Sequence, residues 1–342
     1  MTDRVSIESD NRSLHLLYTF SHSANRRRNS LTFLHFLRMF AQCYPDMNAN
    51  MAVPVAMKSD RSATTPKLQF QIVSDLHLEL DNQYSTYSIV PQAPYLILAG
   101  DTGSLADYES YVSFLRRHVT LYKQIFLLLG NHEFHHLSQS RTLFLAHRIP
   151  QETELRGRVT LLDRTRVDLA NDVTLLGCTL WSSIPNSARA AVRGRVKDYQ
   201  YIDGWSVDRH NTEHEKEVTW LREQLRLVQK DSKRRVFIIT HHAPSKQGTS
   251  NPVYESNPWS AAFSTALLEG EAKAWEGLGN VTYWMFGHTH WTAELDICGV
   301  TLISNQRGYV KYVANGKDSH VAHGSSRKSD VHTYDQSRTI WV

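Results

Sequence analysis

The sequence predicts an α/β fold in which two packed β-sheets are flanked by helices. Two uninterrupted apolar runs, at 95–100 and 124–130, are typical of strands that are buried on both faces. Helical patterns alternate with strands in the first half of the chain, whereas strands predominate after residue 280. This change along the chain favours sheets that pack against each other and carry helices on their outer faces.

The individual elements follow from local patterns in chain order. The segment 107–120 has helical spacing, a further helix is expected at about 261–276, and 182–210 is expected to be irregular. The segment 213–230 has the inward-facing series of an amphipathic helix, which is Val218, Leu221, Leu225 and Val228. Strands are predicted at 68–74, 95–100, 124–130, 235–240, 281–287, 292–297 and 300–305, with two or three short ones within 159–180.

The 342 residues have room for one large or two ordinary domains. Residues 67–313 hold nearly all the predicted elements and form the expected domain. Residues 1–66 are expected to be a poorly ordered N-terminal extension, and residues 314–342 a polar C-terminal tail. A basic cluster at 26–28 leaves a mitochondrial targeting role open, although early acidic residues count against a presequence.

Composition excludes several classes of protein. No run of about eighteen apolar residues is present, so no membrane-spanning helix is predicted. The 38 basic and 34 acidic residues leave a net charge of +4, a surplus too small to indicate binding to nucleic acid or membranes. The distant cysteines Cys43, Cys178 and Cys298 form no Cys-x-x-Cys pair. This excludes a cysteine zinc site and fits a reducing compartment such as the cytoplasm.

Polar blocks stand directly after five predicted strands, where the apolar runs end. In α/β sheets, ligands gather at the carboxyl ends of strands, so all the blocks point to one rim of the fold. The blocks are Asp75-Leu76-His77, Gly100-Asp101, Gly130-Asn131-His132-Glu133, His241-His242 and Gly287-His288-Thr289-His290.

The residue types in these blocks favour metal-assisted phosphoryl chemistry. Asp, Asn and His supply oxygen and nitrogen ligands without a thiolate, a set that suits Mn, Fe, Zn, Ni or Co. Asp75 and His77 are two residues apart, so both side chains point the same way on an extended chain. A carboxylate such as Asp101 can bridge two cations about 3.5–4 Å apart, which clamp an in-line displacement at phosphorus. His132 is placed to act as a general acid.

Together, the five blocks resemble those of the calcineurin-like metallophosphoesterases, over about residues 68–313. The resemblance implies a four-layer αββα sandwich of the metal-dependent phosphatase kind, with two divalent transition metals such as manganese. It implies that hydroxide between the metals attacks phosphorus while His132 protonates the leaving oxygen. It also implies that Asp75, His77 and His290 hold one metal, that Asn131, His241 and His288 hold the other, and that Asp101 bridges them.

The motifs LAGDTG, THHAPS and SNQRGY look most like an intracellular branch of small phosphohydrolases. Many members of the family carry Asp or Asn three residues after the bridging aspartate, where this chain has Ser104, so the partner that orients His132 has to come from elsewhere. No Tyr occurs at 102–104, which disfavours the purple acid phosphatases. Of the pair His241 and His242 we favour His241, because it follows the strand directly, and we keep His242 as the alternative.

Substrate contacts are harder to predict, because loops rather than strands carry them. An arginine after the last core strand, in SNQRGY, suits a bidentate contact with phosphate, although a structural ion pair is the alternative. The candidate substrate-binding residues are Glu133, His136, Tyr199, His242 and Arg307.

These observations predict a phosphoric ester hydrolase that acts on a small phosphorylated substrate, either a phosphomonoester or phosphodiester of a small molecule or a nucleotide. A protein phosphatase is an alternative, although the long blocks of the Ser/Thr phosphatase core are missing. A non-catalytic scaffold on the same fold is another, and it would be expected to lack a metal ligand or His132. A nuclease is disfavoured, because the short segment after residue 313 offers no cap domain.

Overall fold

The computed structural model describes residues 67–169, 172–270, 274–313, 317–320 and 333–342. By its internal contacts the chain divides into two units, Met1–Ala63 and Thr64–Val342, and every described residue belongs to the second. The predicted N-terminal extension, with Cys43, therefore lies outside the described residues, as do residues 314–316 and 321–332 of the predicted tail.

The first sheet has five strands in the order β13-β1-β2-β3-β4. β1 to β4 run parallel, whereas β13 pairs antiparallel with β1 at the edge, with Ile340 opposite Phe70. Both side chains are buried between the sheets, so the prediction of a polar tail is wrong for the end of the chain. The strands are β1 (Gln69–Val73), β2 (Tyr95–Ala99), β3 (Gln124–Leu128), β4 (Val159–Leu161) and β13 (Thr339–Trp341).

The second sheet has six strands in the order β5-β6-β7-β8-β10-β9. β6, β7, β8 and β10 run parallel, and the edge strands β5 and β9 are antiparallel to their neighbours. β11 (Val310–Val313) and β12 (Lys317–His320) form a separate two-stranded pair. The strands of the second sheet are β5 (Thr165–Leu169), β6 (Val173–Cys178), β7 (Arg235–Thr240), β8 (Val281–Met285), β9 (Glu294–Ile297) and β10 (Val300–Ile303).

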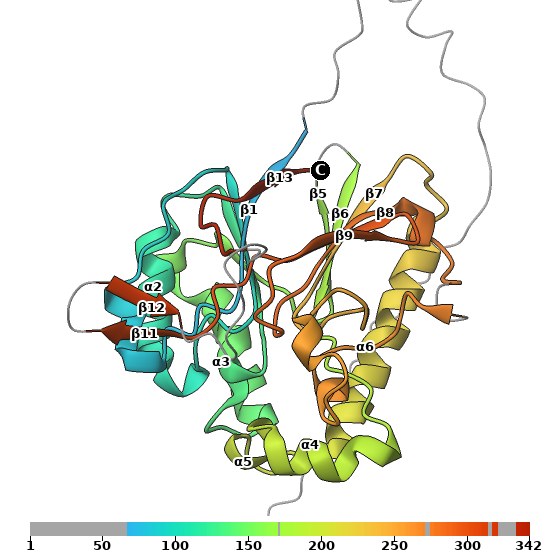
Figure 1. Ribbon diagram of the computed structural model, residues 1–342. Helices are drawn as coiled ribbons and strands as arrows, with labels where there is room; N and C mark the ends of the chain where they lie inside the picture. The colour runs from blue at the N-terminus through green and yellow to red at the C-terminus, as the bar shows by residue number, and fades with distance from the viewer. Residues whose placement is uncertain (1–66, 170–171, 271–273, 314–316, 321–332) are drawn as a thin grey trace, which may run out of the picture. The chain divides into compact units, whose positions relative to one another are not determined.

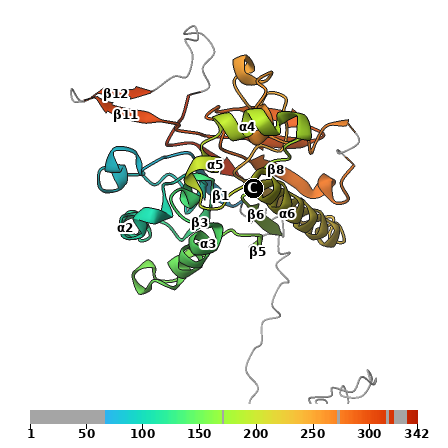
Figure 2. The same cartoon turned by 90° about the horizontal axis from the view of Figure 1, so that it is seen from below.

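Helices cover the outer face of each sheet and make four layers, which confirms the predicted αββα sandwich (Figures 1 and 2). α2 (Tyr108–His118) and α3 (Gln139–Arg148) pack on the first sheet, and α6 (Val207–Val228) packs on the second. The period-two alternation of the strands separates the cores. In β2, for example, Leu96 and Leu98 face α2, whereas Ile97 and Ala99 lie in the core between the sheets.

The helices differ from prediction in several places, and α3 was not predicted at all. α6 begins at Val207, six residues before the predicted start, because Ser206 caps it and accepts a hydrogen bond from the backbone of Arg209. The segment 182–210 is not irregular throughout, since it contains α4 (Arg189–Arg195) and α5 (Asp198–Tyr201). These two helices have seven and four residues, too few to show a helical period in the sequence.

The helix predicted at about 261–276 is not formed by the described residues of that segment. A 3₁₀ turn is present at Ser260–Ala262, and the backbone beyond it pairs with the loop after β7. Ala243 donates to the carbonyl of Phe263, and Thr265 donates to the carbonyl of Ala243. The 3₁₀ turns are Leu80–Ser85, Leu105–Asp107, His132–Phe134, Ile149–Gln151, Thr153–Leu155, Asn186–Ala188, Pro252–Tyr254, Ser260–Ala262 and Leu278–Asn280.

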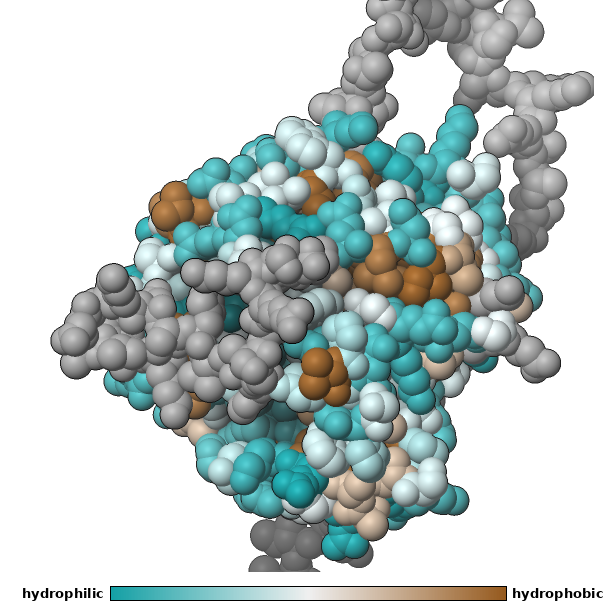
Figure 3. Space-filling model, viewed as in Figure 1, coloured by the Kyte–Doolittle hydropathy of each residue, from teal (hydrophilic) through white to brown (hydrophobic). Residues whose placement is uncertain are grey.

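The surface in Figure 3 is mostly hydrophilic, with several separate hydrophobic areas. Large exposed hydrophobic side chains come from different elements, among them Leu121, Phe144 and Val253. Within the described part of the chain, no helix combines the length and the apolar character that crossing a bilayer requires.

Candidate metal centre

The five polar blocks follow β1, β2, β3, β7 and β8, and the structure brings them together where these strands end. A parallel bridge between Ser74 and Gln306 joins the end of the first sheet to the segment that follows β10. Residues in the left-handed backbone region concentrate here, which is unusual for side chains with a Cβ atom. They include Asp75 (φ 54°), His77 (φ 48°), Asp101 (φ 51°), His288 (φ 68°) and His290 (φ 50°). Such strain is typical of functional sites.

Asp75, His77 and His290 form one group of potential metal ligands, with all ligand atoms within 4.8 Å of one another. The two imidazoles present Nε2 atoms to each other at 2.9 Å. His290 Nε2 lies 3.6 Å from Asp75 Oδ1. The Asp75 and His77 side chains are almost completely buried, and His290 is partly exposed. A cluster of this kind can hold one cation.

Asp101, His241 and His288 form a second group, with their ligand atoms again within 4.8 Å. Asn131 belongs beside it, because its Oδ1 lies 3.1 Å from His241 Nε2. The two oxygens of Asp101 face different groups: Oδ1 is 3.3 Å from His241 Nε2, and Oδ2 is 3.7 Å from His77 Nε2. Asp101 therefore lies between the groups, in the position that a bridging ligand needs.

Hydrogen bonds behind the site orient the ligand atoms. His241 Nδ1 donates to the Ala99 carbonyl at 3.1 Å, which leaves Nε2 as the atom that faces Asp101. Asn131 Nδ2 donates to Asp198 Oδ1 at 2.8 Å, so its oxygen turns toward His241. His135 Nε2 also contacts Asp198 Oδ1, at 3.0 Å.

His241 and His242 are clearly distinguished by their surroundings. His241 faces the other donors, whereas His242 packs on the ring of His288 at 4.2 Å and against Trp181. Neither ring nitrogen of His242 has a hydrogen-bond partner among the described residues. The geometry thus favours His241 as the ligand and gives His242 a packing role.

Two glycines in the blocks allow the backbone to approach these carboxylates. A Cβ atom on Gly130 would collide with Asp101 Oδ1 and the Asp101 backbone nitrogen. A Cβ atom on Gly287 would lie 2.7 Å from Asp75 Oδ2. The glycines that precede Asn131 and His288 are therefore required by the packing of the carboxylates.

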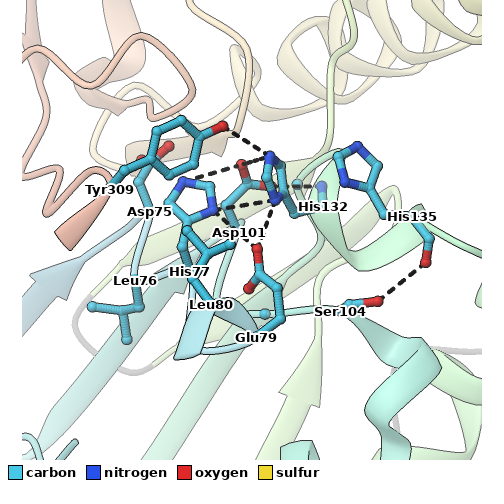
Figure 4. Close-up of polar contacts among 12 residues, drawn as sticks. Asp75, Leu76, His77, Glu79, Leu80, Asp101, Ser104, His132, His135 and Tyr309 are labelled. Atoms are coloured by element: carbon cyan, nitrogen blue, oxygen red, sulfur yellow. Dashed lines mark hydrogen bonds and ion pairs between the residues drawn. The ribbon is translucent and has the colours of Figure 1, made fainter. Parts of the chain in front are cut away.

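His132 has a carboxylate partner, Glu79, that no sequence motif indicates (Figure 4). Its Nδ1 donates to Glu79 Oε1 at 2.7 Å, and its Nε2 lies 3.2 Å from the hydroxyl of Tyr309. Ser104, which stands where many relatives carry an acid, instead donates to the backbone carbonyl of His135. Glu79 thus orients the His132 ring. Nε2 of His132 is then the nitrogen that faces the open side of the site.

Burial and charge shift pKa values in opposite directions here. Burial alone would lower the pKa of His132, but the charge of Asp101 and the hydrogen bond to Glu79 raise it to about 10. Burial would raise the pKa of Glu79, but hydrogen bonds from the neighbouring imidazoles, first His132, lower it to about 2. Burial holds the pKa of His288 and His290 well below the usual range. These last two imidazoles are neutral, the form that binds metals.

The donor set fits divalent transition metals. Carboxylate oxygens and imidazole nitrogens converge from mostly buried positions, and sulfur is absent from both groups. His288 Nε2 is buried and has no hydrogen-bond partner in the described part of the chain. Unlike His242, which shares this feature, His288 belongs to a group whose ligand atoms lie within 4.8 Å of one another. Each group combines a carboxylate with two histidines, and Asp101 faces both.

Four of the five residues that were predicted to contact the substrate do not line the cavity beside the site. Glu133 is fully buried and accepts hydrogen bonds from the backbone of Gly130 and Asp101, so its prediction as a loop contact is wrong. Tyr199 packs in the core and contacts His210, and His136 stacks near Tyr201. Neither lines the cavity beside the site. His242 is the buried packing residue described above.

Arg307 does line the cavity, but its guanidinium makes hydrogen bonds within the protein. Its two terminal nitrogens donate to the Leu76 carbonyl at 3.0 Å and to Gln83 Oε1 at 2.7 Å. It also stacks on Tyr87 at 4.3 Å. Arg307 therefore fastens the loop that carries Asp75 and His77, and the prediction of a bidentate phosphate contact is not supported.

A cavity of about 950 Å³ opens beside the two ligand groups. Asp101, Asn131, His132, His288 and His290 form its floor, so these side chains are reachable from it. Its size lies within the range of small-molecule sites, about 300–1,000 Å³.

Comparisons with known proteins agree with this geometry. The family model for calcineurin-like phosphoesterases matches residues 68–292. The chain is 26% identical over 270 residues to the uncharacterized protein L509 of Acanthamoeba polyphaga mimivirus, which covers 69% of this chain and 90% of that protein. The phosphopantetheinyl hydrolase of Mycobacterium tuberculosis is similar in structure, with a TM-score of 0.56, 16% identity, and coverage of 72% of this chain and 91% of that chain. At this level of identity the likeness shows a shared fold.

Proposed function

Because the chain belongs to the calcineurin-like phosphoesterase family, we propose that it hydrolyses phosphoesters of small molecules or nucleotides with two divalent transition metals. The observation that carries this proposal is Asp101, whose two oxygens face the two ligand groups at 3.3 and 3.7 Å. One group would be Asp75, His77 and His290, and the other would be Asn131, His241 and His288. Manganese is our first candidate, because the ligands are oxygen and imidazole nitrogen without thiolate.

Metals bound here would polarise the phosphoryl oxygens and make water a stronger nucleophile near neutral pH. The remaining steps fall to the side chains. His132 holds a proton on Nε2 next to the cavity, while Glu79 accepts the hydrogen bond from Nδ1 and fixes the ring. In-line displacement at phosphorus would place the leaving oxygen near this nitrogen, where His132 would transfer the proton. Tyr309 would contact the same oxygen, since its hydroxyl lies 3.2 Å from His132 Nε2.

The cavity supports a small substrate over a phosphorylated protein. Its volume of about 950 Å³ suits a compact organic phosphate. The complete set of donors supports catalysis over a non-catalytic scaffold, which would not need them. One structural neighbour is a phosphopantetheinyl hydrolase, so a phosphopantetheine ester belongs among the compounds to be tested. The described cysteines, Cys178 and Cys298, are unpaired, which supports a reducing compartment such as the cytoplasm.

The test is a screen of the full-length chain after reconstitution with Mn²⁺. The panel comprises phosphomonoesters, linear and cyclic phosphodiesters, nucleotides and a phosphopantetheine ester. We expect hydrolysis of at least one class, and loss of that activity in Asp101→Asn. A metal-loaded chain that hydrolyses none of these compounds would contradict the proposal.

A further inference from the structure

The cavity beside the metal centre extends well past the floor where phosphorus would react. Its outer walls come from segments that are distant in sequence, which include the loop after β7, the turn between α4 and α5, and residues 306–309. The phosphoryl group itself needs only the floor, so these walls face the rest of the substrate. Their chemistry indicates what that part of the substrate contains.

One wall is aromatic. Phe263 stacks on the ring of His288, with centroids 4.6 Å apart and an angle of 23° between the planes. Trp259 stands at the other end of the same 3₁₀ turn, Ser260–Ala262, and both side chains are half-buried and line the cavity. Aromatic surface in a cavity of this size favours a flat or apolar group, which it removes from water. Because Phe263 touches His288, that group would lie directly beside the reacting phosphate.

The lining next to these aromatic side chains is basic. The guanidinium of Arg195 lies 5.5 Å from the centre of the Trp259 ring, and the side chain is exposed. Lys246 lines the cavity from the loop after β7. Neither cation has a salt bridge to a carboxylate in the described part of the chain. Unneutralised cations at the mouth of a cavity raise the local concentration of anions and favour their binding.

The acidic side chains of the cavity do not neutralise this basic lining. Asp198 is buried and held by Asn131 and His135. Glu255 accepts a hydrogen bond from the Gly248 backbone at 3.3 Å. Asp198 is thus held within the protein, whereas Glu255 is exposed and keeps its charge. Three exposed cations, Arg195, Lys197 and Lys246, line the same cavity and outnumber it.

We propose that the substrate carries a planar ring and a second phosphate in addition to the one that is hydrolysed, as a nucleoside bisphosphate does. The ring packs on Trp259 and Phe263, and the second phosphate binds Arg195 and Lys246. This inference rests on the proposed phosphoesterase function and specifies its substrate class.

Four compounds separate the two features. Glycerol phosphate has neither, a nucleoside 5′-monophosphate has only the ring, a sugar bisphosphate has only the second phosphate, and a nucleoside 3′,5′-bisphosphate has both. With the full-length, Mn²⁺-loaded chain we expect kcat/KM to rise about tenfold for each feature, the effect of one good charge-assisted contact or one stacked ring.

Single substitutions test whether Arg195 recognises the second phosphate and whether Phe263 recognises the ring. Arg195→Gln should reduce the advantage of bisphosphates over monophosphates about tenfold, whereas the matched control Arg193→Gln, an exposed arginine on the same helix outside the cavity, should not. Phe263→Leu should reduce the advantage of compounds with a ring. Binding of the nucleoside bisphosphate, measured by calorimetry in a His132→Ala background, should weaken with Arg195→Gln and remain unchanged with Arg193→Gln.

Equal kcat/KM values for all four compounds, or equal effects of the two arginine variants, would overturn this inference. That outcome would leave the phosphoesterase function standing. Hydrolysis of a phosphodiester but of none of the four compounds would also overturn the inference. Failure of the proposed function is different, because then no compound of the larger panel, diesters included, would be hydrolysed.

Discussion

Glu79 Oε1 lies 2.7 Å from His132 Nδ1, and this contact sets which nitrogen of the proposed general acid faces the cavity. The carboxylate comes from the segment after β1 and the imidazole from the segment after β3, so the pairing joins two separate strand ends. It takes the place of an acid near the bridging aspartate, where this chain has Ser104. The function of His132 therefore depends on a residue outside its own loop.

Replacement of Glu79 should impair proton donation by His132 without loss of the bound metals. Glu79→Ala should lower kcat about 10–100-fold, the usual effect of removing a partner that orients a functional imidazole. Glu79→Gln should recover part of the loss, because its amide oxygen still accepts from Nδ1. Steady-state kinetics with an alkyl phosphate would show this order, and equal losses in both variants would argue against a positioning role.

His132→Ala should slow the hydrolysis of esters with poor leaving groups far more than that of activated aryl esters. A general acid contributes about 10²–10⁴-fold, and that contribution vanishes when the leaving oxygen needs no proton. A series of phenyl phosphates with graded leaving-group pKa measures the effect. A uniform decrease across the series would exclude His132 as the proton donor.

Gly130→Ala should disturb the site through Asp101, because the added methyl group would collide with the Asp101 carboxylate. We expect metal affinity to fall by at least about tenfold, as judged by competition with a chelator. Gly194→Ala is the matched control, since nothing lies within 4 Å of a Cβ atom at that helical position. If both variants bound metal like the unmodified chain, the close packing at Gly130 would be irrelevant to the site.

Glu217 should make stability depend on pH. It is buried on α6, its Oε2 has no hydrogen-bond partner among the described residues, and burial raises its pKa well above the ordinary value of 4.5. Because the pKa is higher in the folded chain, the stabilisation by the neutral side chain is complete below about pH 4.5 and is lost as pH rises toward the folded pKa.

Glu217→Gln removes this titration and keeps the shape of the side chain. The variant's free energy of unfolding should therefore exceed that of the unmodified chain by a margin that grows from pH 5 to pH 8, with a slope of at most about 1.4 kcal/mol per pH unit. Urea unfolding at several pH values provides the measurement. A margin that stayed constant with pH would show that Glu217 is ionised in the folded chain.

The positions of most site residues could be predicted from the sequence, because each block directly follows an apolar strand. Asp75, Asp101, Asn131, His241 and His288 needed only the rule that parallel strands place their carboxyl ends together. Glu79 was missed although Asp75-Leu76-His77 is followed two residues later by this acid, in a segment with no regular pattern. Its partner is 53 residues away, and no local signal specifies such a contact.

The parts of the fold that were missed depend on long-range pairing. β13 joins the first sheet through residues about 270 positions from its partner in β1, and a three-residue strand has too short a pattern to be recognised. The helix expected at about 261–276 is replaced by a turn and backbone bonds to Ala243, so tertiary contacts override local helical spacing there. The contact between Asp198 and Asn131 joins residues 67 positions apart, so it too emerges only from the fold.

The most direct test of the central claim is the metal content of the purified full-length chain after loading with Mn²⁺ and removal of excess metal. Elemental analysis should find about two metal ions per chain, because Asp101 faces two separate groups of ligands. Asp101→Ala should retain clearly less, with the helical control Gly194→Ala unchanged. A chain that binds no transition metal, or that binds the same amount after loss of Asp101, would contradict the account.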